Sequence, residues 1–262
     1  MREIITIQIG QAGNSIGEKF WEYTCNEHGI DPLGIFQGEN DLQLERINVY
    51  FTETKSGRYV PRSIFTDVEQ NSLNKIRNST YGNLFHPEFM INGKTSASNN
   101  FAKGFFTEGD LNKNKYLNEK TIIPGAEMLP ELTEIIRKIA EECDLVHGFQ
   151  FVHSVSGGSG GGLGALLIDN IRQEYSDQII KSYSIFPALS MSQIVIEPYN
   201  SVLTMTHLIE NTDETFCFDN VALFNILNKI LRISSGNFND INQIIAQVMI
   251  GITACFRFPG DD

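Results

Sequence analysis

The sequence predicts an α/β fold built on a doubly wound, mostly parallel sheet with helices on both faces. Apolar runs of strand length alternate with segments of helical periodicity along the 262 residues. Glycine-rich turns follow two of these strands, at residues 10–14 and 156–162, and each turn leads into a helix. Because such turns at the ends of parallel strands converge on one crevice, we expect a ligand site at the C-terminal edge of the sheet.

The first part of the chain contains the first strand–turn–helix step. Residues 2–9 are predicted to form a strand with Ile5, Ile7 and Ile9 on one face, and a helix begins beyond Gly10. Further strands are predicted at 47–51 and 58–61, around a turn at 55–57, and at 63–68.

Two acidic residues, Asp67 and Glu69, stand where the strand at 63–68 ends. Carboxylates at the C-terminal end of a strand, beside a phosphate site, are where a Mg²⁺ ligand or its water shell belongs. The alternative is that one of them caps the helix that follows. Both interpretations remain open from these residues alone.

The stretch from residue 83 to 125 lacks periodicity and is predicted to be loop, and its second part, 110–125, is polar and exposed. A helix is expected at 127–143, where apolar residues recur every three or four positions. The last helix, at 241–258, has apolar residues on more than one face, as in a helix buried between two layers. Between these two helices we expect strands at 181–189 and 214–219 and helices at 202–209 and 221–233.

The second glycine turn is the most informative stretch. An apolar strand from Phe149 leads through Ser154 into the glycine loop at residues 157–162, and a helix begins directly after it. Bare backbone N–H groups and a helix N-terminus then face one point, which suits an anion such as phosphate. No lysine follows, so this is not the Gly-x-x-x-x-Gly-Lys-Ser/Thr loop, and a phosphate here needs backbone dipoles and a metal ion for neutralisation. Tight packing is the other common use of such a glycine run.

The same loop also fits the Gly-x-Ser-x-Gly nucleophile elbow of α/β hydrolases, with Ser159 as the nucleophile. That elbow needs an acid and then a histidine downstream, and His207 is the only later histidine. His207 falls in an apolar-periodic helical stretch, where a packed or surface histidine is the simpler interpretation. Since a run this rich in glycine matches the pattern easily, we disfavour the hydrolase.

The composition narrows the classes of partner. The formal net charge of −12 argues against a nucleic-acid partner, because no basic stripe is present to meet the phosphates. No apolar run reaches membrane-spanning length and no signal peptide is recognisable, so we expect a cytoplasmic protein that does not enter a membrane. The four cysteines are widely spaced and are expected to be reduced, packed thiols.

Several longer motifs point to a family. Residues 1–4 read Met-Arg-Glu-Ile, 10–14 Gly-Gln-Ala-Gly-Asn, and 41–50 Asp-Leu-Gln-Leu-Glu-Arg-Ile-Asn-Val-Tyr. Residues 197–200 read Glu-Pro-Tyr-Asn, 210–215 Glu-Asn-Thr-Asp-Glu-Thr, and 257–260 Arg-Phe-Pro-Gly. Together and in this order they resemble tubulin, and the opening and the ending favour the β type.

The resemblance implies a domain organisation. A Rossmann-like GTPase domain is expected over residues 1–236, and the core helix and the start of an intermediate domain over 237–262. The family continues with the rest of that domain and a C-terminal helical pair, so we expect the chain to be truncated.

The resemblance also implies roles for individual residues in binding GTP or GDP with Mg²⁺. Gln11 and the glycine loop would face the phosphates, Glu69 would be associated with Mg²⁺, and Glu197 would contact the ribose. Asn220 and Asn242 would read the guanine edge, because amides pair with both its donors and its acceptors. The full set of expected nucleotide contacts is Gly10, Gln11, Ala12, Asn99, Ser154, Gly157, Gly158, Ser159, Gly160, Gly161, Glu197, Asn220, Phe238 and Asn242.

The departures from the family pattern lie on the phosphate side. Serines stand in place of glycines at Ser96, Ser98 and Ser156, Gly161 stands in place of a serine, and Gln193 replaces an aspartate near the ribose. Phe238 keeps an aromatic ring on the base but lacks the tyrosine hydroxyl of the family. Residues 110–125 resemble an insertion near the lateral contacts of protofilaments. We expect guanine recognition to persist and phosphate binding to weaken.

The resemblance leads to two functional hypotheses. The first is a guanine-nucleotide-binding protein of the microtubule cytoskeleton, with an α-tubulin-like subunit, other tubulins and chaperonin as partners. The second is a nucleotide-poor structural paralogue that caps or sequesters tubulin. We expect little GTP hydrolysis by the isolated chain, because in the family the activating acid comes from the neighbouring α subunit. We also expect an exposed apolar face on the helix at 241–258, and hence aggregation, oligomerisation or chaperone binding.

Overall fold

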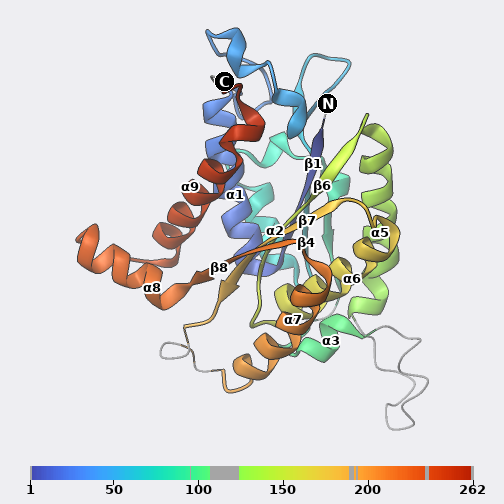
Figure 1. The fold of residues 1–262 in the computed structure, drawn as a ribbon, viewed down its shortest axis with the longest axis vertical. Coiled ribbons are helices and arrows are strands. Elements are labelled where there is room, and N and C mark those ends of the chain that lie inside the picture. Colours follow the sequence, from blue (N-terminus) through green and yellow to red (C-terminus); the bar gives the residue numbers. More distant parts are fainter. Residues whose placement is uncertain are drawn as a thin grey trace.

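The computed structural model describes residues 2–94, 96–106, 124–188, 192, 194–233 and 236–260. Its centre is a six-stranded sheet in the order β5-β4-β1-β6-β7-β8, in which every neighbouring pair is parallel (Figure 1). The strands of this sheet are β1 (Glu3–Ile9), β4 (Ser63–Asp67), β5 (Met90–Asn92), β6 (Val146–Ser154), β7 (Ile179–Phe186) and β8 (Glu214–Asp219). The predicted α/β fold class is confirmed.

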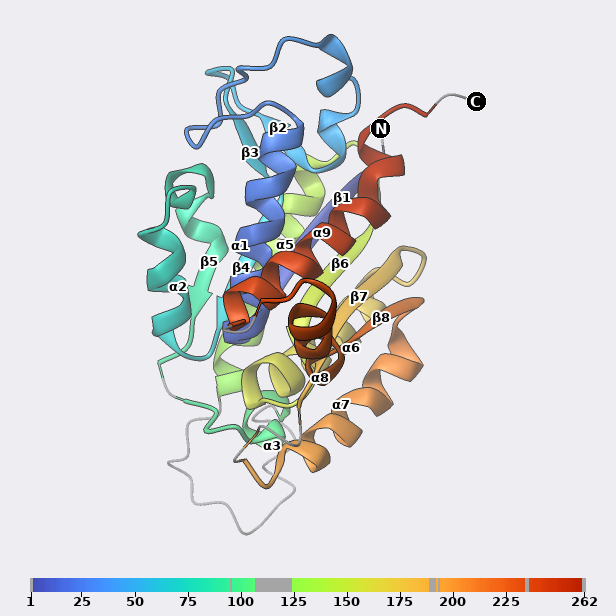
Figure 2. The same cartoon turned by 90° about the vertical axis from the view of Figure 1, so that its left-hand side faces the viewer.

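Helices cover both faces of the sheet (Figures 1 and 2). The helices α1, α2, α8 and α9 contribute to the apolar core on one face, and α5, α6 and α7 contribute to the core on the other. Along β1 the side chains alternate between the two cores, and Ile5, Ile7 and Ile9 share one core as predicted. The helices are α1 (Gly10–Glu27), α2 (Gln70–Arg77), α3 (Phe101–Phe105), α5 (Pro124–Glu142), α6 (Gly164–Glu174), α7 (Glu197–Asn211), α8 (Asn220–Asn225) and α9 (Phe238–Arg257).

Several elements differ from the sequence-based prediction. The stretch from residue 83 contains β5, which pairs with β4, and the helix α3, which packs on the glycine loop. Both elements are too short for a periodic pattern to reveal them. The strand predicted at 47–51 is a 3-10 turn at Ile47–Val49, followed by the antiparallel hairpin of β2 (Phe51–Glu53) and β3 (Tyr59–Pro61).

The helix predicted at 221–233 is shorter than expected. It consists of α8 and a π-helical turn at Ile226–Ile230. The expected insertion at 110–125 lies almost entirely outside the described residues, and Gln193 lies outside them. All four cysteines are free thiols, but only Cys25 is buried, and Cys217 and Cys255 are exposed.

The C-terminal helix α9 lies along α1 (Figure 2). The buried Arg257 side chain at the end of α9 pairs with Glu27 at the end of α1 at 2.5 Å, so the two helices begin at the same end of the molecule. Ile241, Ile245 and Ile250 of α9 are buried in the core to which α1 also contributes, whereas Val248 and Phe256 are exposed. The exposed apolar face is therefore narrower than predicted. In the described part of the chain, no helix combines the length and the apolarity needed to cross a bilayer.

Candidate functional site

The two glycine turns meet at the point where the strand order reverses. From β1 the chain adds β4 and β5 on one side and then places β6 on the other, and folds of this kind bind ligands at the carboxyl ends of such strands. Gly10 follows β1 with a φ of +74°, which favours glycine. A Cβ atom at Gly10 would lie 3.1 Å from the backbone nitrogen of Gly160 and 3.4 Å from the Cβ atom of Ser159. The predicted convergence of the two turns is thus present.

Close packing accounts for most glycines of the loop, which forms a π-helical turn at Gly158–Leu163 before α6. A Cβ atom at Gly160 would lie 2.5 Å from the carbonyl oxygen of Ser154. A Cβ atom at Gly158 would lie 2.6 Å from that of Ala97. Gly157 is the exception, because a Cβ atom there would have no neighbour within 4 Å. The loop therefore leaves backbone accessible at Gly157 and uses the later glycines for packing.

Gly161, which stands in place of a family serine, is closely packed in the loop. A Cβ atom at Gly161 would lie 2.6 Å from Thr204 Oγ1 and 2.8 Å from the carbonyl oxygen of Val155. Its backbone N–H donates to the carbonyl of Gly157 at 3.1 Å. A serine has no room here, so replacing Gly161 by serine does not restore a phosphate contact.

Asp67 is held against the glycine loop at the end of β4. The Ser72 hydroxyl donates to Asp67 Oδ2 at 2.5 Å, and the Ser159 hydroxyl also hydrogen-bonds to this carboxylate. Burial raises the pKa of Asp67, and the two serine hydroxyls act in the opposite direction. The backbone N–H of Glu69 donates to Asp67 Oδ1 at 3.3 Å. A buried carboxylate therefore stands directly beside the loop, as the sequence suggested.

Glu69 is the residue that precedes α2, but its side chain makes no capping hydrogen bond. Its carboxylate is exposed and accepts a hydrogen bond from the hydroxyl of Ser96. The capping alternative is therefore wrong for Glu69. Within the described residues, no group of three or more His, Cys, Asp or Glu side chains is placed to hold a metal ion. Two carboxylates alone fit Mg²⁺, which commonly takes one or two carboxylates and completes its shell with water and phosphate oxygens.

His153 supports the glycine loop from within β6 and was missed by the sequence analysis. The side chain is fully buried, with Nδ1 2.8 Å from the carbonyl oxygen of Gly160 and Nε2 3.0 Å from the hydroxyls of Ser182 and Ser184. Because a carbonyl only accepts, Nδ1 carries the proton and Nε2 accepts from a serine. Burial lowers the pKa of His153 to about 4, so the ring is neutral at pH 7.

The loop at residues 96–100 has unusual backbone geometry. Ser98 and Asn99 adopt left-handed conformations, with φ of +50° and +55°. This conformation costs a serine more than a glycine, and asparagine tolerates it better than most residues. Ser98, which stands in place of a family glycine, is therefore strained in this loop. Ser156, in contrast, is not among the described residues with positive φ.

Glu197 begins α7 at the same edge of the sheet and is 9% exposed. Its Oε2 atom is buried and has no hydrogen-bond partner. A buried carboxylate oxygen without a donor is unfavourable, so a ligand hydroxyl would satisfy it.

The residues expected to read a base lie at the starts of α8 and α9. Asn220 is the first residue of α8 and Asn242 lies in the first turns of α9, and both are half-buried. Phe238 is 62% exposed and meets Phe224 of α8 edge to face, with ring centroids 5.6 Å apart. The exposed Gln11 stands at the start of α1, at the end of the molecule where α9 also begins.

The structure gives no support to the hydrolase alternative. The hydroxyl of Ser159 bonds to Asp67. His207 pairs with Asp169, 2.9 Å away, and packs against the ring of Phe105. A nucleophile elbow needs a histidine within hydrogen-bond reach of the serine, and neither residue has the other as a partner.

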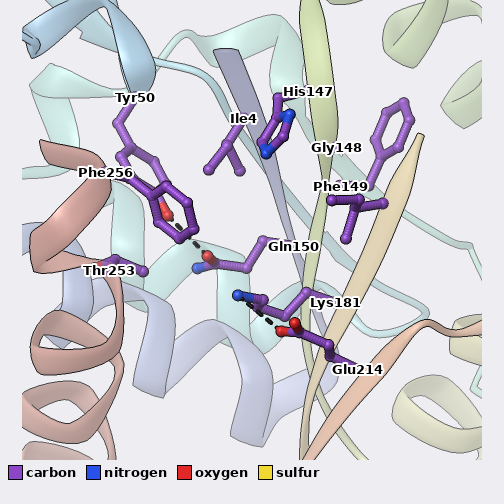
Figure 3. A pocket seen from close by; sticks show the side chains of 11 residues that line it. Ile4, Tyr50, His147, Gly148, Phe149, Gln150, Lys181, Glu214, Thr253 and Phe256 are labelled. Carbon is purple, nitrogen blue, oxygen red and sulfur yellow. Dashed lines mark hydrogen bonds and ion pairs between the residues drawn. The ribbon is translucent and has the colours of Figure 1, made fainter. Parts of the chain in front are cut away.

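A cavity of about 70 Å³ lies at the opposite edge of the sheet, between the first residues of the strands and the end of α9 (Figure 3). Lys181 pairs with Glu214 at 2.9 Å, and the Tyr50 hydroxyl donates to Gln150 Oε1 at 2.9 Å, both within its lining (Figure 3). Ligand pockets for small molecules usually have several hundred Å³, so this cavity is too small for a nucleotide.

Comparison with known protein families identifies the fold. The model of the Tubulin/FtsZ family, GTPase domain, matches residues 3–228. The matched range contains both glycine turns, Asp67, Glu69, Glu197 and the start of α8, and it covers most of the chain. Proteins of this family generally bind GTP or GDP with Mg²⁺ and associate with other members of the family. The chain belongs to the tubulin/FtsZ family, and its GTPase domain makes it a GTP-binding, tubulin-like protein.

Proposed function

We propose that this chain is a β-tubulin-like protein that binds GTP or GDP with Mg²⁺ and works in the microtubule cytoskeleton, as a subunit or as a regulator. The observation that carries the proposal is the contact between Gly10 and the Ser159–Gly160 turn at the reversal of strand order. Asp67 and Glu69 stand beside that contact, where a metal ion bound to phosphate belongs.

Each part of the nucleotide has candidate partners in this chain. Backbone N–H groups at Gln11, Ala12 and residues 157–160 would bind the phosphates, and Asn99 and Ser154 flank them. Gly161 would contribute by close packing, because its N–H is already bonded to the carbonyl of Gly157. Glu69 would hold Mg²⁺ through its carboxylate, and the ion would supply the positive charge that a lysine provides in other phosphate loops. The unpartnered oxygen of Glu197 supports a ribose contact. Asn220 and Asn242 would pair with guanine, and the exposed ring of Phe238 would stack on it.

The isolated chain should hydrolyse little GTP. Asp67 is already engaged by Ser72, Ser159 and the N–H of Glu69, and both ring nitrogens of His153 are bonded. Neither group is free to activate a water molecule. The resemblance to tubulin assigns the activating acid to a neighbouring α-type subunit. Steady phosphate release by purified monomer over several hours would contradict this proposal.

The test of nucleotide binding is direct. The protein is purified in Mg²⁺, denatured, and the released nucleotide is identified by chromatography and mass spectrometry. A second preparation is loaded with an equal mixture of GTP and ATP, and the ratio of the two nucleotides that it releases shows whether the protein prefers guanine to adenine. Release of GTP or GDP in amounts close to one per chain supports the proposal. Release of ATP, or of no nucleotide after loading, overturns it.

A nucleotide-poor paralogue is the second candidate, and two features favour it. Ser98 stands in a left-handed conformation, and the Ser96 hydroxyl occupies the Glu69 carboxylate. Both features lie in the loops expected to hold the phosphates. If no nucleotide is retained, but the protein shortens or blocks microtubule growth in a tubulin assembly assay, this second candidate replaces the first.

We also propose the division into a GTP-binding domain at 1–236 and a core helix at 237–262, with an α-tubulin-like subunit or another tubulin as partner. An exposed row of apolar side chains on and before α7 supports association, because monomers rarely expose such a row. Analytical ultracentrifugation tests this, and a clean monomer that binds neither tubulin nor chaperonin contradicts it. The row consists of Val195, Tyr199, Val202 and Ile209, each at least 65% exposed.

A further inference from the structure

One buried side chain, Asn200, bridges the two loops that face the candidate phosphate site. Its Nδ2 group donates to the carbonyl of Asn99 at 2.6 Å and to the carbonyl of Ser156 at 2.9 Å. Its Oδ1 atom accepts from the backbone N–H of Phe101 at 3.2 Å. Asn200 is 4% exposed, and both amide hydrogens and the amide oxygen have partners.

The bridge joins segments that are otherwise distant. Asn99 belongs to the loop after β5, Ser156 to the loop after β6, and Asn200 to the first turn of α7. The bond at Asn99 acts on a residue with φ of +55°, next to the strained Ser98. The Asn200 side chain is buried, and its two bonds to the loop carbonyls are part-buried, so water competes with them less than it does at an exposed site. A displacement of either loop therefore breaks a bond of the same amide group.

A second contact fixes α7 itself against the glycine loop. Thr204, one turn after Asn200, is fully buried, and its hydroxyl lies between the carbonyl of Val155 at 3.1 Å and that of Asn200 at 2.9 Å. Gly161 leaves the space that Thr204 fills, since a Cβ atom there would lie 2.6 Å from Thr204 Oγ1. Because α7 is packed against the glycine loop in this way, the position of Asn200 relative to both loops is restricted.

We propose that Asn200 is a positioning residue that couples the 96–100 loop to the glycine loop, so that a nucleoside diphosphate meets them as one preformed unit. This inference rests on the proposed function, because it assumes that these loops bind the phosphates. Asn200 itself acts through the two carbonyls and not through contact with the ligand. Its removal should therefore affect the phosphate part of binding and leave the nucleoside part unchanged.

The variant Asn200→Ala tests the coupling, and Ser201→Ala is the matched control. Ser201 is the next residue and is 8% exposed, and among the described residues its hydroxyl bonds to the carbonyl of Glu197, within α7. Affinities for GDP and guanosine are measured by calorimetry in Mg²⁺. We expect Asn200→Ala to weaken GDP about tenfold or more and guanosine less than about twofold, as loss of buried hydrogen bonds to one part of a ligand predicts. Ser201→Ala should change neither. Equal losses for GDP and guanosine, or no loss, overturn the inference.

Hydrogen exchange on the nucleotide-free protein separates this inference from the proposed function. Peptides covering 97–101 and 154–158 should both exchange faster in Asn200→Ala than in wild type, and Ser201→Ala should match wild type. If the wild-type protein binds no GDP, the proposed function is wrong. The hydrogen-exchange rates of the two segments then show by themselves whether Asn200 couples the two loops. Faster exchange in only one of the two segments, or in neither, overturns it.

A second variant keeps the test valid if Asn200→Ala does not fold. Asn200→Asp has the same size and keeps the acceptor for the N–H of Phe101, but it has no hydrogen for the carbonyls of Asn99 and Ser156. We expect faster exchange at 154–158 with little change at Phe101. Unchanged exchange at 154–158 overturns the coupling.

Discussion

The phosphate-facing end and the base-facing end of the candidate site are built in different ways. At the phosphate end, close backbone contacts fix the positions of the residues. Gly160 packs against the backbone of Ser154, and Gly104 of α3 packs against that of Gly158. A Cβ atom at Gly104 would lie only 2.0 Å from the carbonyl oxygen of Gly158. At the base end, Phe238 is 62% exposed and the asparagines project from the starts of helices. Under the proposed function, nucleotide binding would depend on side-chain identity at the base end and on the absence of side chains at the phosphate end.

This contrast has a consequence for how the site can change. A substitution at the phosphate end disturbs the packing of several segments, because the glycine loop contacts the helices α1, α3, α6 and α7 and the strands β1 and β6. A substitution at the base end alters ligand contacts and leaves the core intact. The serines at 96, 98 and 156 are tolerated because Ser96 and Ser98 lie on exposed loop positions and Ser156 is only half-buried. The serines that replace family glycines at the phosphate end therefore stand where a side chain has room.

The largest effect is expected for Gly160→Ala. The new Cβ atom would lie 2.5 Å from the carbonyl oxygen of Ser154 and 3.0 Å from its nitrogen, and neither backbone atom can move independently. We expect a loss of about 1–3 kcal/mol in the free energy of unfolding by urea, as for other overpacked sites. GDP affinity should fall about 100-fold or more, corresponding to roughly 2.7 kcal/mol or more. Gly157→Ala, with nothing within 4 Å, is the control and should unfold like wild type. Equal stability of the two variants would show that the loop is not packed as described.

The pH dependence of stability tests the support beneath the phosphate end. Burial lowers the pKa of His153 from 6.5 to about 4. Below about pH 6.5 the unfolded chain therefore gains a proton that the folded chain does not take up. The stabilisation is complete above pH 6.5 and is lost as the pH falls to about 4, which amounts to about 3 kcal/mol.

His153→Asn removes this titration and can still donate to the carbonyl of Gly160. Unfolding free energies are measured for both proteins at pH 7, 5.5 and 4.5. We expect the advantage of wild type to shrink steadily as the pH falls. A constant difference between the two proteins over this range would mean that His153 does not stay neutral.

A smaller and more selective effect is expected at the base end. Asn242→Ala removes an amide that would pair with guanine, so the preference for GDP over ADP should fall about tenfold or more, as for a lost specific hydrogen bond. Stability should change by less than about 0.5 kcal/mol, because alanine favours the helix and the site is not closely packed. The exposed Gln247 on α9 provides the control Gln247→Ala. A variant that keeps full guanine preference would remove Asn242 from the site.

The smallest effect is expected for Ser98→Gly. Glycine adopts the φ of +50° without strain, so unfolding free energy should rise by about 0.5–1 kcal/mol after the entropy of glycine in the unfolded chain is included. Asn99→Gly should gain less, because asparagine already tolerates φ of +55°. Thermal unfolding of wild type, Ser98→Gly and Asn99→Gly shows whether their stabilities follow this order. If Asn99→Gly gains as much as Ser98→Gly, strain at Ser98 is not what separates this loop from a glycine loop.

By itself, the sequence determined the fold class, the two glycine turns at strand ends, and the acidic residues beside them. These features follow from patterns among nearby residues: alternation along β1, periodicity along α5, and glycine directly after an apolar strand. The order of the strands then follows from few options, because parallel crossovers have one hand.

Tertiary structure decided which residues hold the site in place. Asn200 reaches Asn99 across 101 positions and Ser156 across 44, and His153 reaches Ser182 across 29. The packing that excludes a side chain at Gly161 depends on Thr204 of another helix. Local patterns cannot encode such contacts, because they exist only once the sheet order has brought distant segments together. The periodicity of apolar residues predicts which face of a helix or strand is buried. Only the folded chain determines which residues pack against that face.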